Sequence, residues 1–183
     1  RLGVKAPIAG RVYERTLLEA GSIVAVGDFH HRPGIECEIA FRTKSDLGDA
    51  TGAYTAEMAR ALVASVHPAI ELVCTRYVGG FAIAPALLVA DGSAHAALIV
   101  GDAIDPATAG DLRVATCQLV VDGTTLASGN GSEVLGDPYV ALAWLCNHLL
   151  GRGIELPAGS LITTGSCTGI VPSGPDQHIV NNA

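Results

Sequence analysis

The stretch GIECEIAFR, residues 34–42, alternates between two rows of side chains and predicts a β-strand. Successive side chains of a strand point to opposite faces of its sheet, so every second residue shares a face. One face would carry the apolar row Ile35, Cys37, Ile39 and Phe41. The other face would carry Glu36, Glu38, Ala40 and Arg42. The apolar row predicts that this strand is buried on one side.

Glu36 and Glu38 would stand about 7 Å apart along one face, because a strand rises by that much in two residues. Two carboxylates this close disfavour each other's ionisation unless a positive charge lies between them. Carboxylate oxygens suit hard divalent cations such as Mg²⁺ or Mn²⁺, so the pair is a candidate metal site. The alternative is a solvated strand face on which both acids point at water, and the short motif alone favours this alternative.

A second strand-like stretch, HPAIELVCTRY at residues 67–77, places one acid in an otherwise apolar run. This acid, Glu71, lies between two aliphatic residues, and burying a lone carboxylate is costly without a partner. If the two strands are neighbours, Glu71 completes a cluster of three carboxylates. The alternative for Glu71 is an ion pair with Arg76 or Arg42.

The composition suits a single globular domain. The chain has 183 residues, of which 49% are hydrophobic, enough for one sizeable core. Its net charge of −7 argues against nucleic acid or an anionic membrane as a partner. The longest apolar run, residues 81–90, is too short to cross a bilayer. The five cysteines form no C-x-x-C pair, which indicates buried free thiols in a reducing compartment, the cytoplasm.

The remaining pattern predicts an α+β, mostly β domain with an antiparallel or mixed sheet. A helix is expected at residues 55–66. The strongest helix begins at Asp137, which would cap it with Pro138 in its first turn, and ends near residue 150. Further strands are expected at residues 23–26, 96–100, 113–121, 125–128 (after a hairpin turn at 122–123) and 161–164.

Residues 165–169, GSCTG, follow the last predicted strand. A glycine-flanked loop with hydroxyl side chains can offer these hydroxyls and backbone N–H groups to an anionic ligand. An ordinary polar turn is the equal alternative. The loop does not match G-x-S-x-G and no His–Asp relay is readable, so Ser166 is not predicted to be a serine nucleophile.

Five segments, in order, resemble the 2-keto-4-pentenoate hydratase family of the fumarylacetoacetate hydrolase superfamily. They are GIECEIAFR at 34–42, PAIELVCTRY at 68–77, ADGS at 90–93, LGDPYVALAWLCNHL at 135–149 and LITTGSCTG at 161–169. The resemblance spans residues 2–172. It implies a rolled mixed β-sheet core of the fumarylacetoacetate-hydrolase C-terminal-domain type with flanking helices. It also implies that residues 1–183 form a single catalytic-type domain lacking the family's N-terminal segment and the end of its C-terminus.

The resemblance implies a site as well. Three acids would be the metal ligands: Glu36, Glu38 and Glu71. They would hold Mg²⁺ or Mn²⁺ and leave positions for the 2-oxo and carboxylate groups of a small-molecule 2-oxo acid. Two residues would be catalytic, namely Ser166 and Asp91. The substrate-binding residues would be Arg76, Gly165, Ser166 and Thr168.

The implied activity is that of a hydro-lyase in the catabolism of aromatic compounds, in a homo-oligomer. A 2-hydroxydienoate would be hydrated, through its 2-oxo-enoate tautomer, to a 4-hydroxy-2-oxo acid. Two enzymatic alternatives stay open within the superfamily, a 2-oxo diacid decarboxylase and an acylpyruvate hydrolase. A third alternative is a non-catalytic subunit that binds metal or forms oligomers.

The chain departs from the family's pattern at two places, and the first, an absent lysine, motivates the non-catalytic alternative. The family's upstream Lys-Ile-Gly motif, whose lysine is thought to act in catalysis, has no counterpart before Leu2-Gly3-Val4. Lys5 and Lys44 are the only lysines, and neither matches. The family's Asp-Asn pair is Asp91-Gly92 here, which lacks the side-chain amide.

Overall fold

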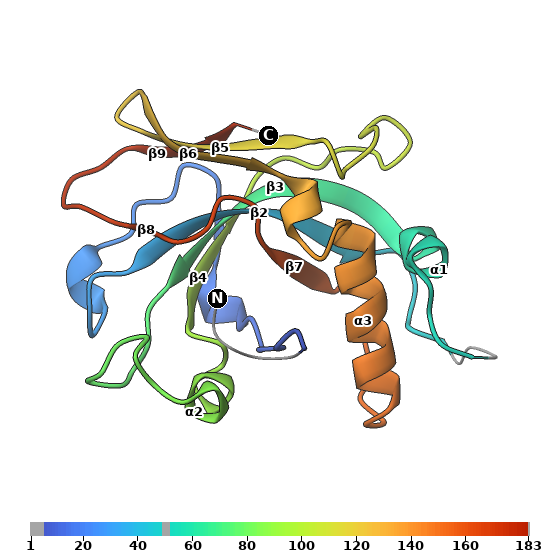
Figure 1. The fold of residues 1–183 in the computed structure, drawn as a ribbon. Coiled ribbons are helices and arrows are strands. Elements are labelled where there is room, and N and C mark those ends of the chain that lie inside the picture. The colour runs from blue at the N-terminus through green and yellow to red at the C-terminus, as the bar shows by residue number, and fades with distance from the viewer. Residues whose placement is uncertain (1–5, 49–51, 183) are drawn as a thin grey trace.

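The computed structural model describes residues 6–48 and 52–182, which form two β-sheets with helices at their edges (Figure 1). The larger sheet has the strand order β1-β4-β3-β2-β7, with β8 beside β2. Its strands are β1 (Leu17–Glu19), β2 (Gly34–Thr43), β3 (Val63–Val73), β4 (His95–Val100), β7 (Leu161–Ser166) and β8 (Val171–Pro172). The β1–β4 pair is parallel and the other pairs are antiparallel, so the sheet is mixed.

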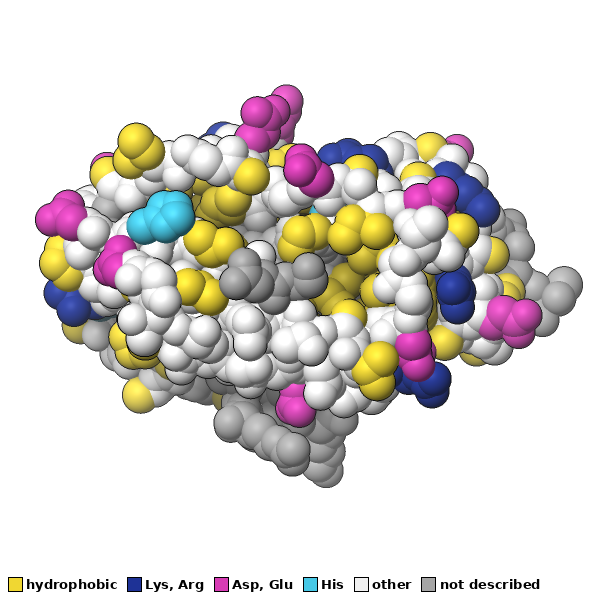
Figure 2. All heavy atoms as spheres, turned by 90° about the horizontal axis from the view of Figure 1, so that it is seen from above, with side chains coloured by type: hydrophobic (Ala, Val, Ile, Leu, Met, Phe, Trp, Pro, Cys, Tyr) yellow, Lys and Arg dark blue, Asp and Glu magenta, His cyan; other side chains and the backbone are white. Residues whose placement is uncertain are grey.

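The smaller sheet lies over one face of the larger one, at the top of Figure 1. It has the order β6-β5-β9 and consists of β5 (Thr116–Val121), β6 (Thr124–Asn130) and β9 (Ile179–Asn182). Asp122 and Gly123 both have positive φ, the conformation of a tight hairpin turn, so the predicted hairpin is confirmed. Figure 2 looks down on this sheet and shows apolar side chains across its middle and acidic side chains around the rim.

The main core lies between the two sheets. The predicted apolar row of β2 is buried, with Ile35, Cys37, Ile39 and Phe41 each at most 3% exposed. This row packs with side chains that β5 directs inward, namely Cys117, Leu119 and Val121. The predicted strand is therefore confirmed, and its apolar face is directed at the smaller sheet. By the period of a strand, its acidic face is on the opposite side of the larger sheet.

Within the described residues, three α-helices flank the sheets, namely α1 (Ala56–Ala61), α2 (Pro85–Ala90) and α3 (Pro138–Leu150). The predicted start of α3 is confirmed, because the Asp137 side chain accepts a hydrogen bond from the Tyr139 N–H and Pro138 lies in the first turn. Tyr139 also stacks on Phe41, with ring centroids 4.9 Å apart. This contact fixes α3 against the strand that carries two of the acids.

Two of the predicted elements are wrong. The helix expected at residues 55–66 ends at Ala61, because residues from Val63 onward pair with β2 along its whole length and tertiary pairing overrides helix propensity. Residues 23–26 form no strand. Ile23 is 99% exposed, and Val26 begins a 3₁₀ helix, η2 (Val26–Asp28).

The structure also bears on the expectations for the cysteines, for membrane-spanning helices and for the fold class. All five cysteines are free and buried, as predicted. None of the helices formed by residues 6–48 and 52–182 is long and apolar enough to span a bilayer. The prediction of a mixed, sheet-dominated domain with flanking helices is confirmed.

Candidate metal centre

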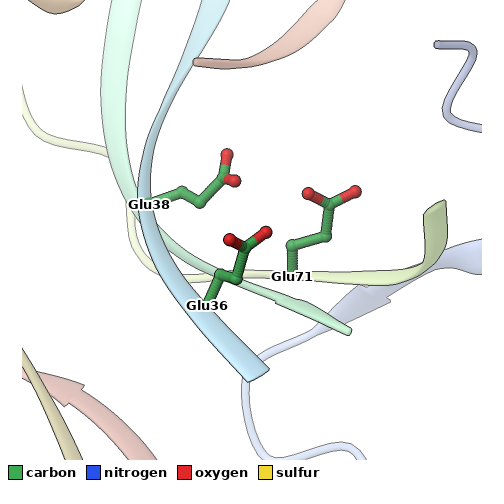
Figure 3. Close-up of side chains that lie close together, drawn as sticks. All are labelled: Glu36, Glu38 and Glu71. Carbon is green, nitrogen blue, oxygen red and sulfur yellow. The ribbon is translucent and has the colours of Figure 1, made fainter. Parts of the chain in front are cut away.

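The register of β2 and β3 brings three acids together. Glu36 lies directly opposite Glu71 across the two strands, and Glu38 lies two residues further along β2 on the same face. The three side chains converge above the sheet (Figure 3). One carboxylate oxygen from each can be chosen so that all three lie within 4.8 Å of one another. The structure thus assembles the predicted ligand set, whose role in binding metal stays a prediction.

Glu38 is the most deeply buried of the three, at 1% exposure. Its Oε2 accepts hydrogen bonds from the Thr163 hydroxyl and from the Gly165 backbone N–H, the latter at 3.0 Å. Burial, followed by the charges of Glu71 and Glu36, raises the pKa of Glu38 well above its ordinary value, and the Gly165 N–H opposes this rise. Glu38 is therefore rigidly held and electrostatically short of a positive partner.

A β-bulge explains how Gly165 reaches Glu38. Glu38 pairs with Ser166 but Ala40 pairs with Thr163, so β7 contains one extra residue at this point. Gly165 has φ of +113° there, a conformation that a residue with a Cβ rarely adopts. The bulge turns the Gly165 N–H toward the carboxylate. This is the local structural reason for the glycine in the LITTGSCTG segment.

Glu36 is half-buried at the other side of the cluster. Burial and the charge of Glu71 raise its pKa from 4.5 to about 7. The neighbouring Ser166 hydroxyl partly offsets this rise. The hydroxyl itself is buried and makes no well-formed hydrogen bond with any residue that the structure describes. A polar atom of this kind beside three acids is available to a ligand in the cavity.

The raised pKa of Glu36 predicts how the stability of the metal-free protein depends on pH. Between about pH 4.5 and pH 7 the folded chain keeps a proton on Glu36 that the unfolded chain has already released. The stabilisation is complete below the unfolded pKa and is lost as pH rises through the folded pKa. With about 1.4 kcal/mol for each pKa unit, the loss is on the order of 2–3 kcal/mol.

Urea unfolding of the metal-stripped protein at pH 5 and pH 8 measures this loss. Glu36→Gln is the matched control, since it should be less sensitive to pH over the same window. Equal pH dependence in the wild-type protein and the variant would contradict the expected behaviour of Glu36.

Glu71 pairs with His95 instead of an arginine. Its Oε1 lies 2.8 Å from His95 Nδ1, and the two side chains are largely buried. The alternative of an ion pair with Arg76 or Arg42 is therefore wrong. The Arg42 guanidinium donates to the Gly159 carbonyl, and that of Arg76 is engaged elsewhere.

Arg76 and Asp91 form an ion pair of their own, with Nε and Oδ1 2.7 Å apart. The Arg76 backbone N–H also donates to the second Asp91 oxygen, and its guanidinium donates to the carbonyls of Cys74, His95 and Asp91. These bonds join the end of β3 to the turn after α2. Neither residue lines the cavity beside the carboxylates, and their predicted substrate-binding and catalytic roles stay predictions.

The Thr168 hydroxyl is also hydrogen-bonded to the backbone. It accepts from the Cys37 N–H at 3.1 Å and donates to the Gly169 carbonyl, which ties the loop to β2. Of the predicted catalytic and substrate-binding residues, only Ser166 and Gly165 line the cavity with the three acids. Thr168 does not line it.

The acids lie in the wall of a cavity of about 1160 Å³. The N-terminal segment 7–14, α2, α3 and β7 form its other walls. Beside the acids, the same face of the sheet is apolar, with Ala40, Ala69 and Leu98 buried together. Apolar side chains of α3 also line the cavity, among them Leu142, Leu145 and Leu149. The cavity therefore offers a small acidic spot, apolar side chains from α3, and the cationic side chains of Arg11, Arg42 and Arg152.

Sequence reasoning did not identify His95 or Thr163 as parts of the site. His95 begins β4, and its neighbour Glu71 is 24 residues away along the chain. Thr163 is 125 residues from Glu38. Alternation along β7 would have placed Thr163 on one of two faces, but only the pairing of β7 with β2 shows which acid it meets.

Comparisons with known proteins identify the family of this chain. The family model "Fumarylacetoacetate (FAA) hydrolase C-terminal" matches residues 5–181. A 4-oxalocrotonate decarboxylase of Pseudomonas sp. (strain CF600) is 32% identical over 179 residues, 98% of this chain and 66% of that protein. A 2-hydroxyhexa-2,4-dienoate hydratase of Comamonas testosteroni is 36% identical over 143 residues, 78% of this chain and 53% of that protein.

Among solved structures, the 4-oxalocrotonate decarboxylase from Pseudomonas putida G7 complexed with magnesium and adipate has a TM-score of 0.90 and 31% identity. The match covers 98% of this chain and 67% of that one. This chain spans 66% of the length of the curated decarboxylase from strain CF600. The predicted fold type is confirmed by these matches.

Proposed function

The chain belongs to the fumarylacetoacetate hydrolase family, and from this membership we propose that it is a divalent-metal-dependent enzyme acting on a 2-hydroxydienoate or its 2-oxo-enoate tautomer. The reaction that we propose is hydration to a 4-hydroxy-2-oxo acid. The observation that carries the proposal is the convergence of Glu36, Glu38 and Glu71 within one cavity wall. The likeness to dienoate and pentenoate hydratases supports the reaction class.

The residues of the site fit a hard divalent cation. Three carboxylate oxygens are the donors that Mg²⁺ or Mn²⁺ prefers, and an ion held by these three acids would have further coordination positions for a substrate. Two of the acids have raised pKa values, which is the expected electrostatic state of a cation site before the cation is bound. When bound, the ion supplies a Lewis acid for the 2-oxo and carboxylate groups of the substrate.

The chain's own residues hold and orient the reactants. Thr163 and Gly165 fix Glu38, so this ligand needs little reorganisation. Leu142, Leu145 and Leu149 of α3 provide an apolar surface for the hydrocarbon part of a dienoate. The Ser166 hydroxyl is the group best placed to hydrogen-bond an oxygen of the substrate, because it is buried beside Glu36 and lacks a well-formed bond.

Decarboxylation of a 2-oxo diacid is the second candidate. It is favoured by the match to the 4-oxalocrotonate decarboxylases, which covers nearly the whole chain and extends to the three-dimensional structure. The two candidates share the acids and differ in the bond that breaks. Hydration adds water across a conjugated double bond, whereas decarboxylation releases carbon dioxide. We propose a homo-oligomer for either candidate, which light scattering on the purified chain would test.

Assays with the purified chain and Mg²⁺ distinguish these reactions. We expect a 2-hydroxydienoate to lose its ultraviolet absorbance without release of carbon dioxide. The rate should fall at least about 100-fold in Glu36→Gln, because a lost ligand should cost more than the 10–100-fold typical of outer-shell partners. The exposed acid Glu57 on α1 supplies the control variant Glu57→Gln, which should be unchanged.

Other outcomes of the same assays would replace the proposal. Carbon dioxide released from a 2-oxo diacid would favour the decarboxylase, and pyruvate released from an acylpyruvate would favour the hydrolase. Tight metal binding without turnover of any of these substrates would favour the non-catalytic subunit.

A further inference from the structure

We infer that His95 is a positioning residue for the metal centre, and that Thr16 holds His95 in place. In this arrangement His95 engages one oxygen of Glu71, so that the other oxygen is directed to the cation. The inference rests on the proposed function, because it assumes that the three acids bind a divalent metal.

The contacts form a continuous chain of hydrogen bonds. His95 is 7% exposed, with Nδ1 2.8 Å from Glu71 Oε1 and Nε2 2.8 Å from Thr16 Oγ1. The Thr16 hydroxyl lies 2.8 Å from the Tyr13 carbonyl oxygen. Both ring nitrogens of a buried imidazole are therefore engaged, which leaves its ring one orientation in which every bond is made.

The direction of these bonds follows from the Tyr13 carbonyl, which can only accept. The Thr16 hydroxyl has one proton and donates it to this carbonyl, so its oxygen accepts from His95 Nε2–H. On the other side of the ring, Nδ1 and Glu71 Oε1 lie 2.8 Å apart, and a proton must lie between two atoms that would otherwise both be acceptors. Whichever atom carries that proton, Oε1 is engaged by His95, so Oε2 is the oxygen assigned to the cation.

A second β-bulge places His95 on the acidic face. Leu72 pairs with Ala97 but Val73 pairs with His95, so β4 contains one extra residue, Ala96. In regular pairing His95 would point to the opposite face from Glu71, because side chains alternate along a strand. The bulge places the His95 side chain on the same face as Glu71. The bulge in β7 likewise directs a group, the Gly165 N–H, at one of the acids.

Partners of this kind orient metal ligands and commonly change metal affinity 10–100-fold when they are removed. The relay, meaning the hydrogen bonds from Glu71 through His95 and Thr16 to the Tyr13 carbonyl, also reaches the N-terminal segment. Tyr13 lines the same cavity as the three acids. The relay therefore connects one wall of the cavity to the orientation of Glu71.

The dissociation constant for Mn²⁺, measured by electron paramagnetic resonance at 25 °C on metal-stripped protein, tests the inference. We expect His95→Leu to weaken binding about 10–100-fold and His95→Asn, which keeps a donor near the position of Nδ1, to restore part of the loss. Thr16→Val should weaken binding about fivefold, the equivalent of one hydrogen bond, while Thr16→Ser should bind as the wild type does. Circular dichroism would check that each variant is folded at 25 °C.

A double variant separates positioning from stability. If Thr16 acts through His95, adding Thr16→Val to His95→Leu should weaken Mn²⁺ binding no further. Full additivity of the two effects would overturn the relay. If His95→Leu does not fold, the Mn²⁺ affinities of Thr16→Val and Thr16→Ser test the inference instead. Equal affinities of these two variants would overturn it.

The same titrations distinguish the two proposals. A wild-type chain that binds no Mn²⁺ would overturn the proposed function together with this inference. A wild-type chain that binds Mn²⁺, with His95→Leu binding equally well, would overturn the positioning role alone.

Discussion

Glu38→Gln is expected to weaken Mg²⁺ and Mn²⁺ binding by at least about 100-fold, beyond the range typical of outer-shell partners, and to stabilise the metal-free protein. The amide keeps the size of the side chain and can still accept from Thr163 and Gly165. It removes a buried carboxyl group whose ionisation is disfavoured by burial and by the charges of Glu71 and Glu36. One substitution should therefore move the two properties in opposite directions.

Calorimetric metal titration and urea unfolding at pH 8 measure the two effects of Glu38→Gln. The matched control is Glu57→Gln on the exposed face of α1, which should change neither property by a measurable amount. Unchanged metal affinity in Glu38→Gln would contradict the ligand assignment. A less stable metal-free variant would contradict the claim that the cluster is electrostatically strained.

Phe41→Ala is expected to reduce the free energy of unfolding by about 3–5 kcal/mol, the usual cost of removing a buried aromatic ring. Phe41 is fully buried on β2 and stacks on Tyr139, so removing its ring would leave a new void between the sheet and α3. A loss of this size is a large fraction of the stability of an ordinary domain. The strand that carries Glu36 and Glu38 would then lose this stacking contact with the helix.

Urea unfolding of the metal-free protein measures this loss. Phe41→Leu should cost less, because it keeps most of the apolar volume. Val140→Ala, on an exposed position of α3, is the control and should change the free energy of unfolding by less than about 0.5 kcal/mol. A loss below about 1 kcal/mol in Phe41→Ala would contradict the assignment of this ring to the centre of the core.

The parts of the fold that were predicted correctly depend on local rules. Alternation along residues 34–42 gave both the buried row and the acidic row of β2, because a strand's period is set by its own backbone. Asp137 and Pro138 predicted the start of α3, because a cap and a first-turn proline act within a few residues. The helix expected at 55–66 was too long because pairing of residues 63–66 with β2 is not a local property.

In the site, too, the features set by local sequence were predicted and those set by strand pairing were not. Three acids in two strand-like segments were enough to suggest a cluster, and the register of β2 and β3 joined them. The Gly165 N–H and the His95 side chain, which hold Glu38 and Glu71, could not be predicted. Each is placed by a β-bulge that shifts the strand pairing by one residue. Asp91 and Arg76 pair with each other and do not line the cavity, so their predicted roles stay predictions.

The measurement that tests the central claim most directly is a calorimetric titration of Mn²⁺ into the metal-stripped chain, with and without oxalate. Oxalate stands in for the chelating end of a 2-oxo acid. We predict binding in both conditions and affinity at least about fivefold higher with oxalate, the lower end of the usual range of coupling between two ligands. No binding in either condition would show that Glu36, Glu38 and Glu71 do not form an open metal site, and would contradict the account.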